Sequence, residues 1–289
     1  MTTNGSRLAA SGRGGGGEGS GREGSSAGEL IAASALAASE ARSLLAFALD
    51  VPREALIARP QQRVAAEAAQ RFATLAARRR AGEPIAYLLG EREFFGRRFR
   101  VDRAVLVPRP ETECLVESAL QALASRQAPR VADLGTGCGC IAITLALERA
   151  DARVCGTDIS ETALELARRN ASELGARVQF LHGHWYAPLA GRFDLIVANP
   201  PYVAAGDPHL AELAFEPAQA LTDGGDGLSC LRSIVEQASA HLSDDGTLLV
   251  EHGFDQAAEV RAMMQASGFR SVLTRSDLAG LERICAGRR

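Results

Sequence analysis

Hydrophobic and polar residues recur along the chain with two different periods, and the change of period divides the chain into parts. From about residue 29 to residue 82, apolar residues such as Ile31 recur every three or four positions, the spacing of one helix face. Residues 64–80 are rich in Ala and Arg, which are good helix formers. Gly82 and Pro84 follow as a usual helix end. The pattern predicts a small helical domain over residues 29–82.

Residues 83–113 have a different pattern. Aromatic and β-branched residues surround a glycine in the segment from Phe94-Phe95-Gly96 to Phe99-Arg100-Val101. This arrangement is typical of a β-hairpin with a glycine turn. We predict that residues 83–113 form a hairpin linker between two domains.

From about residue 129, short apolar segments alternate with amphipathic ones. The predicted strands are 131–134, 154–158, 178–181, 193–198 and 246–251, and the predicted helices are 141–147, 161–174 and 234–242. Segments 271–274 and 283–286 are candidates for two further edge strands. Alternation of this kind predicts an α/β domain over residues 114–289, with a mostly parallel sheet of up to seven strands and helices on both faces.

Composition narrows the possible functions. Residues 1–28 are mostly Gly, Ser and Arg, cannot bury apolar surface, and are predicted to be disordered. The net charge of −3 provides no general attraction to nucleic acid. All basic residues apart from His are Arg, which excludes a lysine nucleophile.

Cysteine usage and hydropathy indicate a cytoplasmic protein. The six cysteines form no Cys-x-x-Cys pair, so reduced thiols are expected. Cys138 and Cys140 lack a second ligand pair, and no metal site is expected. No apolar run approaches the about 20 residues that a membrane helix needs.

The first chemical signal is a glycine loop. The segment Asp133-Leu134-Gly135-Thr136-Gly137-Cys138-Gly139 follows an apolar strand directly and leads into a helix. Glycines there let a ligand approach the strand ends closely. A dinucleotide fingerprint would place its third glycine at position 140, where Cys140 stands, so the spacing argues against NAD. The loop resembles the cofactor loop of class I methyltransferases.

Asp158 is the second signal. It ends the second predicted strand of the α/β domain, where a carboxylate can accept hydrogen bonds from ribose hydroxyls. The structural alternative is a cap on the next helix, although Ser160 is the better cap candidate. We favour ribose binding because the glycine loop lies upstream.

The third signal is Asn199-Pro200-Pro201-Tyr202, directly after the strand 193–198. Two prolines remove two backbone donors, so acceptors dominate here: the Asn199 side-chain oxygen and the Pro200 carbonyl. Converging acceptors suit an NH₂ group, which has two protons to donate. Tyr202 offers a flat face for a planar group. The alternative is a structural turn stiffened by proline.

These residues resemble the HemK/PrmC family of protein glutamine-N5 methyltransferases. The matching stretches outside the glycine loop and Asn-Pro-Pro-Tyr are residues 82–90, 94–96, 106–113, 215–217 and 226–228. The resemblance covers roughly residues 30–287. It implies a class I methyltransferase fold, Rossmann-like with a mostly parallel seven-stranded sheet, behind a small helical domain for substrate recognition.

The resemblance also implies site residues and substrates. The cofactor would be S-adenosylmethionine, and the substrate the glutamine of the Gly-Gly-Gln loop in peptide chain release factors. The implied cofactor-binding residues are Gly135, Thr136, Gly137, Cys138, Gly139, Asp158, Trp185 and Asn199. The implied catalytic residues are Asn199, Pro200 and Tyr202, and the substrate-binding residues are Asn199, Pro200, Pro201 and Tyr202. We expect a monomer that binds no nucleic acid directly.

Nearby charged residues are interpreted as structural. Glu111 and Glu113 lie two apart on a segment taken as extended, which would put them on one face, but the preceding Pro-Arg-Pro indicates a junction rather than acid–base catalysis. Arg109 is a candidate contact to the macromolecular substrate. His184 stands where relatives often have an acidic residue, and we interpret it as a surface residue.

Three other functions remain open. An amino methyltransferase for nucleic-acid bases would use the same Asn-Pro-Pro-Tyr chemistry on a flipped base, but the net charge and the lack of an inserted recognition domain disfavour it. A non-catalytic binding module would not need an intact glycine loop with Asp158 and Asn199. A dehydrogenase is disfavoured by the glycine spacing.

Overall fold

The computed structural model describes residues 24–289, which form two compact units that divide after Ala76. The sequence-based boundary lay at residue 82. The difference arises because helix α4 (Ala66–Arg80) runs through the division. Within residues 24–289, no helix is both long enough and apolar enough to cross a membrane.

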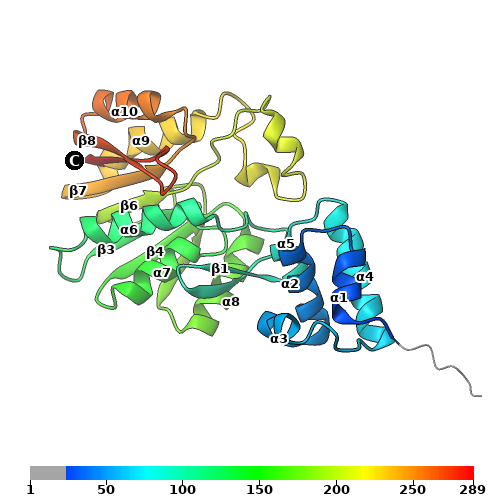
Figure 1. The fold of residues 1–289 in the computed structure, drawn as a ribbon. Coiled ribbons are helices and arrows are strands. Elements are labelled where there is room, and N and C mark those ends of the chain that lie inside the picture. Colours follow the sequence, from blue (N-terminus) through cyan, green and yellow to red (C-terminus); the bar gives the residue numbers. More distant parts are fainter. Residues whose placement is uncertain (1–23) are drawn as a thin grey trace, which may run out of the picture. The chain divides into compact units, whose positions relative to one another are not determined.

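The smaller unit is helical. It contains α1 (Ala27–Ala33), α2 (Ala38–Leu49), α3 (Arg53–Ala58) and the first part of α4, coloured blue to cyan in Figure 1. Its core is made of side chains at helical spacing, led by Leu44, Leu45, Leu56 and Phe72, each at most 3% exposed. Burial of this apolar face stabilises helices that would be marginal alone.

Ordered structure starts earlier than the predicted end of the disordered tail. Residues 1–23 lie outside the described residues. Ser26 caps α1: its Oγ accepts from the Glu29 N–H at 3.3 Å, while the Glu29 carboxylate accepts from the Ser26 N–H at 2.8 Å. Ala27 is fully buried. The prediction of disorder up to residue 28 missed this capping box, because composition alone does not register it.

The predicted hairpin is present and belongs to the larger unit. After α5 (Ile85–Leu89), β1 (Glu91–Phe94) and β2 (Arg97–Arg100) pair antiparallel. The rings of Phe94 and Phe99 meet edge to face, with centroids 6.0 Å apart, and both are buried. The Arg100 N–H donates to Asn170 Oδ1 at 2.8 Å, which ties the hairpin to the following domain.

A seven-stranded sheet forms the centre of the larger unit. Its strands are β3 (Arg130–Leu134), β4 (Arg153–Asp158), β5 (Val178–His182), β6 (Phe193–Ala198), β7 (Leu242–Glu251), β8 (Arg270–Ser276) and β9 (Glu282–Arg288). Their order is β5-β4-β3-β6-β7-β9-β8, parallel except that β9 is antiparallel to both neighbours. The predicted fold class is therefore confirmed.

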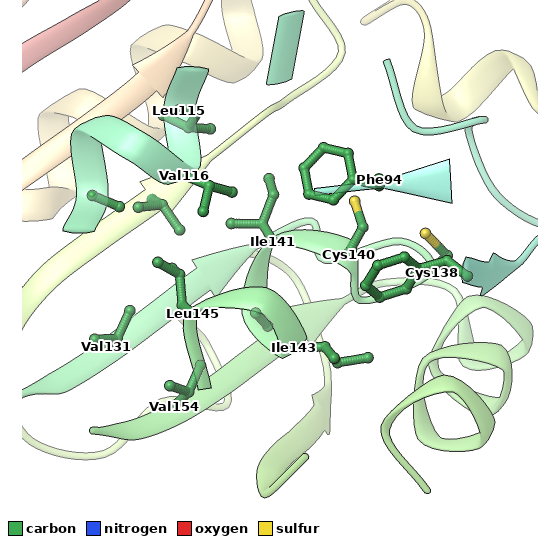
Figure 2. Packing of buried hydrophobic residues seen from close by; sticks show 14 of the residues in the cluster. Phe94, Leu115, Val116, Val131, Cys138, Cys140, Ile141, Ile143, Leu145 and Val154 are labelled. Carbon is green, nitrogen blue, oxygen red and sulfur yellow. The ribbon is translucent and has the colours of Figure 1, made fainter. Parts of the chain in front are cut away.

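Helices cover both faces of this sheet (Figure 1). They are α6 (Glu113–Ala122), α7 (Cys140–Glu148) and α8 (Glu161–Leu174) on one face and α9 (Ser229–His241) and α10 (Ala257–Ala266) on the other, with short 3₁₀ turns at Pro110–Thr112, Pro208–Ala211 and Ala218–Ala220. Strand side chains alternate between the faces: Val131 packs with the first group, and Ala132 with the second. Figure 2 shows Ile141 and Leu145 of α7 in the first cluster.

The order of the strands creates a crevice. From β3 the chain steps outward through β4 and β5 and then returns to β6 on the other side of β3. In open parallel sheets, ligands bind outside the carboxyl ends of the strands at such a reversal. The glycine loop after β3 and Asn-Pro-Pro-Tyr after β6 therefore flank this crevice.

Candidate active site

A pocket of about 120 Å³, partly open to solvent, lies at the carboxyl ends of β3, β4 and β6. The predicted site residues in its lining are Gly135, Thr136, Gly137, Cys138, Asp158, Trp185, Asn199 and Pro201. Gly139, Pro200 and Tyr202 are outside that lining. A further wall comes from six residues within 104–112 together with Gln219 and Ala220, and of these the sequence analysis had named only Arg109, as a candidate substrate contact.

The glycine loop needs its glycines for two different reasons. Gly135 has φ +72°, and a Cβ there would lie 3.1 Å from the Trp185 ring, so Gly135 lets the indole lie against the loop. Gly139 has φ +83°, and a Cβ would lie 2.8 Å from Ile143 Cδ1. Gly139 therefore allows close packing of α7 rather than lining the pocket.

Asp158 points its carboxylate toward the glycine loop. Its Oδ2 accepts from the Gly137 N–H and its Oδ1 from the Ser160 N–H, both at 2.9 Å. Burial raises the Asp158 pKa, and these backbone donors partly oppose the rise. Each oxygen keeps further acceptor capacity for a ligand. The helix cap is Ser160, whose Oγ accepts from the Ala163 N–H at 3.2 Å.

Trp185 forms one wall beside the loop. Its backbone has φ +43°, an uncommon conformation for a side chain of this size. The Trp185 carbonyl accepts from Thr157 Oγ1 at 2.9 Å, which holds the turn in place. His184 stacks edge-on against the indole with ring centroids 5.2 Å apart and stays exposed, in agreement with a surface residue.

Asp133 is fully buried beneath the loop. Its Oδ2 accepts from Thr136 Oγ1 at 2.7 Å and from the Ala142 N–H at 3.2 Å. Its Oδ1 has no hydrogen-bond partner among residues 24–289. Desolvation raises the Asp133 pKa to about 7.

Asp133→Asn is expected to reduce the pH dependence of stability in the ligand-free protein. A carboxyl with a folded pKa near 7 binds more protons in the folded than in the unfolded state between about pH 4 and 7. The contribution of this carboxyl to stability is therefore greatest at the acidic end and is lost as pH rises through 7, at up to about 1.4 kcal/mol per pH unit.

The measurement is urea unfolding at several pH values, followed by the emission of the single Trp, Trp185. Glu251 also has a pKa raised to about 7 and contributes with the same sign. Asp133→Asn should remove one of these two contributions and leave the other. A slope identical to wild type would contradict the assignment.

Only two of the four residues of the Asn-Pro-Pro-Tyr segment line the pocket. Asn199 and Pro201 line it, and Asn199 Nδ2 donates to Thr112 Oγ1 at 3.1 Å. Pro200 is buried. The Tyr202 hydroxyl instead donates to Glu251 Oε1 at 3.3 Å. Burial raises the pKa of the Tyr202 hydroxyl. Tyr202 therefore lies behind the lining, and its packing against a substrate amide stays a prediction.

A second glycine loop holds this segment from behind. The Tyr202 carbonyl accepts from Gln256 Nε2 at 2.9 Å, and a Cβ on Gly227 would lie 2.3 Å from the same carbonyl oxygen. Asp223 shapes the loop by accepting from the Gly225 and Gly227 N–H groups at 2.8 and 3.0 Å. The close approach of the Tyr202 carbonyl oxygen leaves no space for a Cβ at position 227, which explains why glycine occupies it.

Gly227→Ala is expected to cost about 1–3 kcal/mol of unfolding free energy and to lower turnover. The added Cβ both collides with the Tyr202 carbonyl and occupies φ +80°. Urea unfolding and kcat measure the two effects. Gly224→Ala is the matched control, because φ is +76° there but nothing lies within 4 Å of the added Cβ. Equal turnover in both variants would contradict the steric explanation.

The charged residues around Pro-Arg-Pro have structural contacts. Arg109 pairs with Glu216, whose side chain is 1% exposed and also accepts from the Val107 N–H at 2.9 Å. Glu113 Oε1 accepts from the Phe95 N–H at 2.9 Å.

The expected extended segment is not present. Residues 110–112 form a 3₁₀ turn, and Glu113 begins α6, so Glu111 and Glu113 do not share the face of a strand. Proline at position 110 favours the first turn of a helix, which is the physical reason for the difference. Within residues 24–289, no group of three or more His, Cys, Asp or Glu could hold a metal, and Cys138 and Cys140 are free thiols.

Comparison with known proteins agrees with this architecture. Residues 112–228 match the Methyltransferase small domain, and residues 26–90 match the PrmC N-terminal domain. A methyltransferase from Pyrococcus furiosus shares the fold, with a TM-score of 0.51 and 19% identity over 75% of this chain and 98% of that chain. Likewise, a 16S rRNA N2 G1207 methyltransferase from T. thermophilus has a TM-score of 0.52 and 19% identity over 69% of this chain and 49% of that one.

Fold and pocket together define a Rossmann-like class I methyltransferase. Release factor glutamine methyltransferase from Neisseria gonorrhoeae is 50% identical over 90% of this chain and 96% of its own length. The Burkholderia pseudomallei protein of the same name is 51% identical over 91% of this chain and 95% of its own length. The chain belongs to the release factor glutamine methyltransferase family. The predicted family and enzyme class are thus confirmed.

Proposed function

We infer that this chain methylates N5 of a glutamine side chain in peptide chain release factors, with S-adenosylmethionine as the methyl donor. The main observation behind this inference is the hydrogen bond that occupies the nitrogen end of the Asn199 side-chain amide. Its Nδ2 is engaged by Thr112 Oγ1, so its Oδ1 remains as an acceptor on a residue that lines the pocket. A glutamine amide has an NH₂ group to donate there.

The pocket residues fit S-adenosylmethionine. Gly135 permits a ligand and the Trp185 ring to lie close to the loop, and Asp158 retains acceptor capacity for ribose hydroxyls. When bound, S-adenosylmethionine supplies a methyl group on a positively charged sulfur, which is strongly electrophilic.

The residues of the chain would act by orientation rather than by covalent catalysis. An amide nitrogen is a poor nucleophile because its lone pair is delocalised into the carbonyl. Asn199 Oδ1 and the Pro200 carbonyl would accept hydrogen bonds from the two N–H groups, which aims the nitrogen and stabilises the positive charge that develops on it. The nitrogen–methyl bond would form as the sulfur–methyl bond breaks, and the nitrogen would then lose one of its two protons to solvent. Positioning of this kind can supply on the order of 7–11 kcal/mol.

The macromolecular substrate is the release factor segment with the sequence Gly-Gly-Gln. We propose that the chain acts as a cytoplasmic monomer and needs no direct contact with nucleic acid. The net charge of −3 supports the absence of direct contact with nucleic acid, because proteins that bind the phosphate backbone are more often basic.

The test is transfer of labelled methyl from S-adenosylmethionine to purified release factor, with duplex DNA and ribosomal RNA in parallel reactions. Label confined to the glutamine of Gly-Gly-Gln supports the proposal, and release factor with that glutamine changed to alanine is the control. Label on nucleic acid alone would assign the chain to the base-modifying alternative. No label on any of the three would favour a non-catalytic module.

A further inference from the structure

Two segments that are far apart in the sequence complete the lining of the pocket. One is the linker wall, made of the six lining residues within 104–112, and the other carries Gln219 and Ala220. The remaining lining residues lie at or after the carboxyl ends of β3 to β6, or in the first turns of α7 and α8. All of them belong to the larger unit. The shape of the pocket therefore depends on what holds these two segments together.

Glu216 joins the two segments. Its Oε2 accepts from the Val107 N–H at 2.9 Å, and its Oε1 accepts from the Arg109 guanidinium in an ion pair. Val107 is flanked by lining residues, Arg109 itself lines the pocket, and Glu216 lies three positions before Gln219. The Glu216 side chain is 1% exposed, whereas that of Arg109 is 34% exposed. One buried carboxylate thus ties the linker wall to the segment that carries Gln219 and Ala220.

Phe215 makes a second contact between the same parts of the chain. Arg103, which directly precedes the linker wall, lies over the Phe215 ring with its guanidinium carbon 5.4 Å from the ring centroid, a favourable cation–π distance. A Cβ on Gly82 would lie 3.3 Å from Phe215 Cε2, so the ring also packs beside the start of the linker. Residues 215 and 216 are therefore both held by the linker, which restricts where the Glu216 carboxylate can lie.

The junction requires a side chain that accepts hydrogen bonds at two points. The Val107 N–H and the Arg109 guanidinium are both donors, and a carboxylate offers an acceptor oxygen to each of them. A side-chain amide of the same shape has one acceptor end, so its NH₂ end would face a donor. Buried polar groups that lose their partners are costly. The two segments can therefore separate only by leaving the Glu216 carboxylate unpaired, which favours a closed wall.

We propose that Glu216 is a positioning residue that holds the linker wall closed over bound S-adenosylmethionine, by pairing with Arg109 and Val107. Glu216 is not part of the pocket lining, so it acts through these two partners and does not touch the cofactor. A closed wall also excludes water from the electrophilic methyl group. The inference rests on the part of the proposed function that places S-adenosylmethionine in this pocket, and it does not depend on which acceptor is methylated.

The experiment measures S-adenosylmethionine binding by full-length Glu216→Gln protein in the absence of a methyl acceptor. Titration of Trp185 emission gives the dissociation constant, since Trp185 lines the pocket, and stopped-flow displacement gives the release rate. We expect the dissociation constant to rise roughly 10-fold, the order of effect of one lost hydrogen bond to a charged group. The release rate should rise by most of this factor, because affinity differences between related variants lie mainly in dissociation.

Asp277→Asn is the matched control. The Asp277 side chain is 4% exposed, pairs with Arg283 Nε at 3.3 Å and accepts from the Leu281 N–H at 3.0 Å, but none of these three residues lines the pocket. Its unfolding free energy, measured with urea, should fall as it does in Glu216→Gln. Its affinity for S-adenosylmethionine should stay at the wild-type value, which separates a general loss of stability from an effect on the wall.

A double-variant cycle tests whether Arg109 acts through Glu216. With the guanidinium removed by Arg109→Ala, the amide introduced by Glu216→Gln can turn its oxygen to the Val107 N–H without facing a second donor. The double variant should therefore bind S-adenosylmethionine nearly as well as Arg109→Ala alone, and its loss of affinity should be clearly smaller than the product of the two single losses.

The outcomes distinguish the positioning role from a purely structural one. A wild-type dissociation constant and release rate in Glu216→Gln, an equal loss of affinity in Asp277→Asn, or independent effects in the cycle would each overturn the proposal. If Glu216→Gln does not fold, Arg109→Ala decides in its place, and a wild-type affinity there overturns the proposal. Failure of the wild-type protein to bind S-adenosylmethionine would instead refute the proposed function.

Discussion

Asn199→Ala is expected to lower kcat for release factor methylation by roughly 100- to 1,000-fold, the usual effect of removing one preorganised group that stabilises developing charge. The substitution deletes the amide oxygen of a residue that lines the pocket, and with it the acceptor proposed for the substrate NH₂. The amide nitrogen is held by Thr112 in the folded protein, so the lost oxygen is one that the structure keeps in position.

Initial rates at saturating S-adenosylmethionine measure this effect, and circular dichroism checks the fold. Affinity for S-adenosylmethionine should fall much less than kcat, because Asp158 and the glycine loop remain. Near-normal turnover by a folded Asn199→Ala protein would remove the central residue of the mechanism.

Sequence analysis identified the sheet and the parts of the pocket that depend on local pattern. The five parallel strands β3 to β7 are short apolar segments bounded by turns, and pocket residues lie at or just after the carboxyl ends of β3, β4, β5 and β6. Asp158 and Asn199 could therefore be assigned from their place after a strand. Helices α6 and α10 were not predicted, because Pro110 suggested a junction before α6 and the buried positions of α10 are sparse: Ala257, Val260 and Met264.

The rest of the site depends on long-range geometry. Thr112 and Glu251 are far apart in the sequence, and only the pairing of β6 with β7 brings Glu251 near the chain that follows β6. Tyr202 shows the same limit, since a motif indicates which side chain is present but not where it points. Its hydroxyl turns to Glu251, a partner that no local spacing could indicate.

Asp158→Ala is expected to weaken S-adenosylmethionine binding by roughly 10- to 100-fold, because each hydrogen bond to a charged group contributes about 1.5–3 kcal/mol. The change removes the carboxylate proposed to bind the ribose hydroxyls. It also leaves the Gly137 and Ser160 N–H groups without their acceptor, so the glycine loop loses one of its ties to the end of β4, while the Gly135 and Thr136 N–H groups still donate to the Thr157 carbonyl.

Titration of Trp185 emission gives the dissociation constant, and steady-state kinetics give KM for S-adenosylmethionine. Because Asp158 does not orient the substrate amide, kcat at saturating S-adenosylmethionine should stay much closer to wild type than in Asn199→Ala. Asp244→Ala is the control, since that carboxylate is fully exposed and outside the pocket lining. If Asp158→Ala bound S-adenosylmethionine as tightly as Asp244→Ala, the ribose assignment would fail, and the buried Asp133 carboxylate would be the next acidic residue to test.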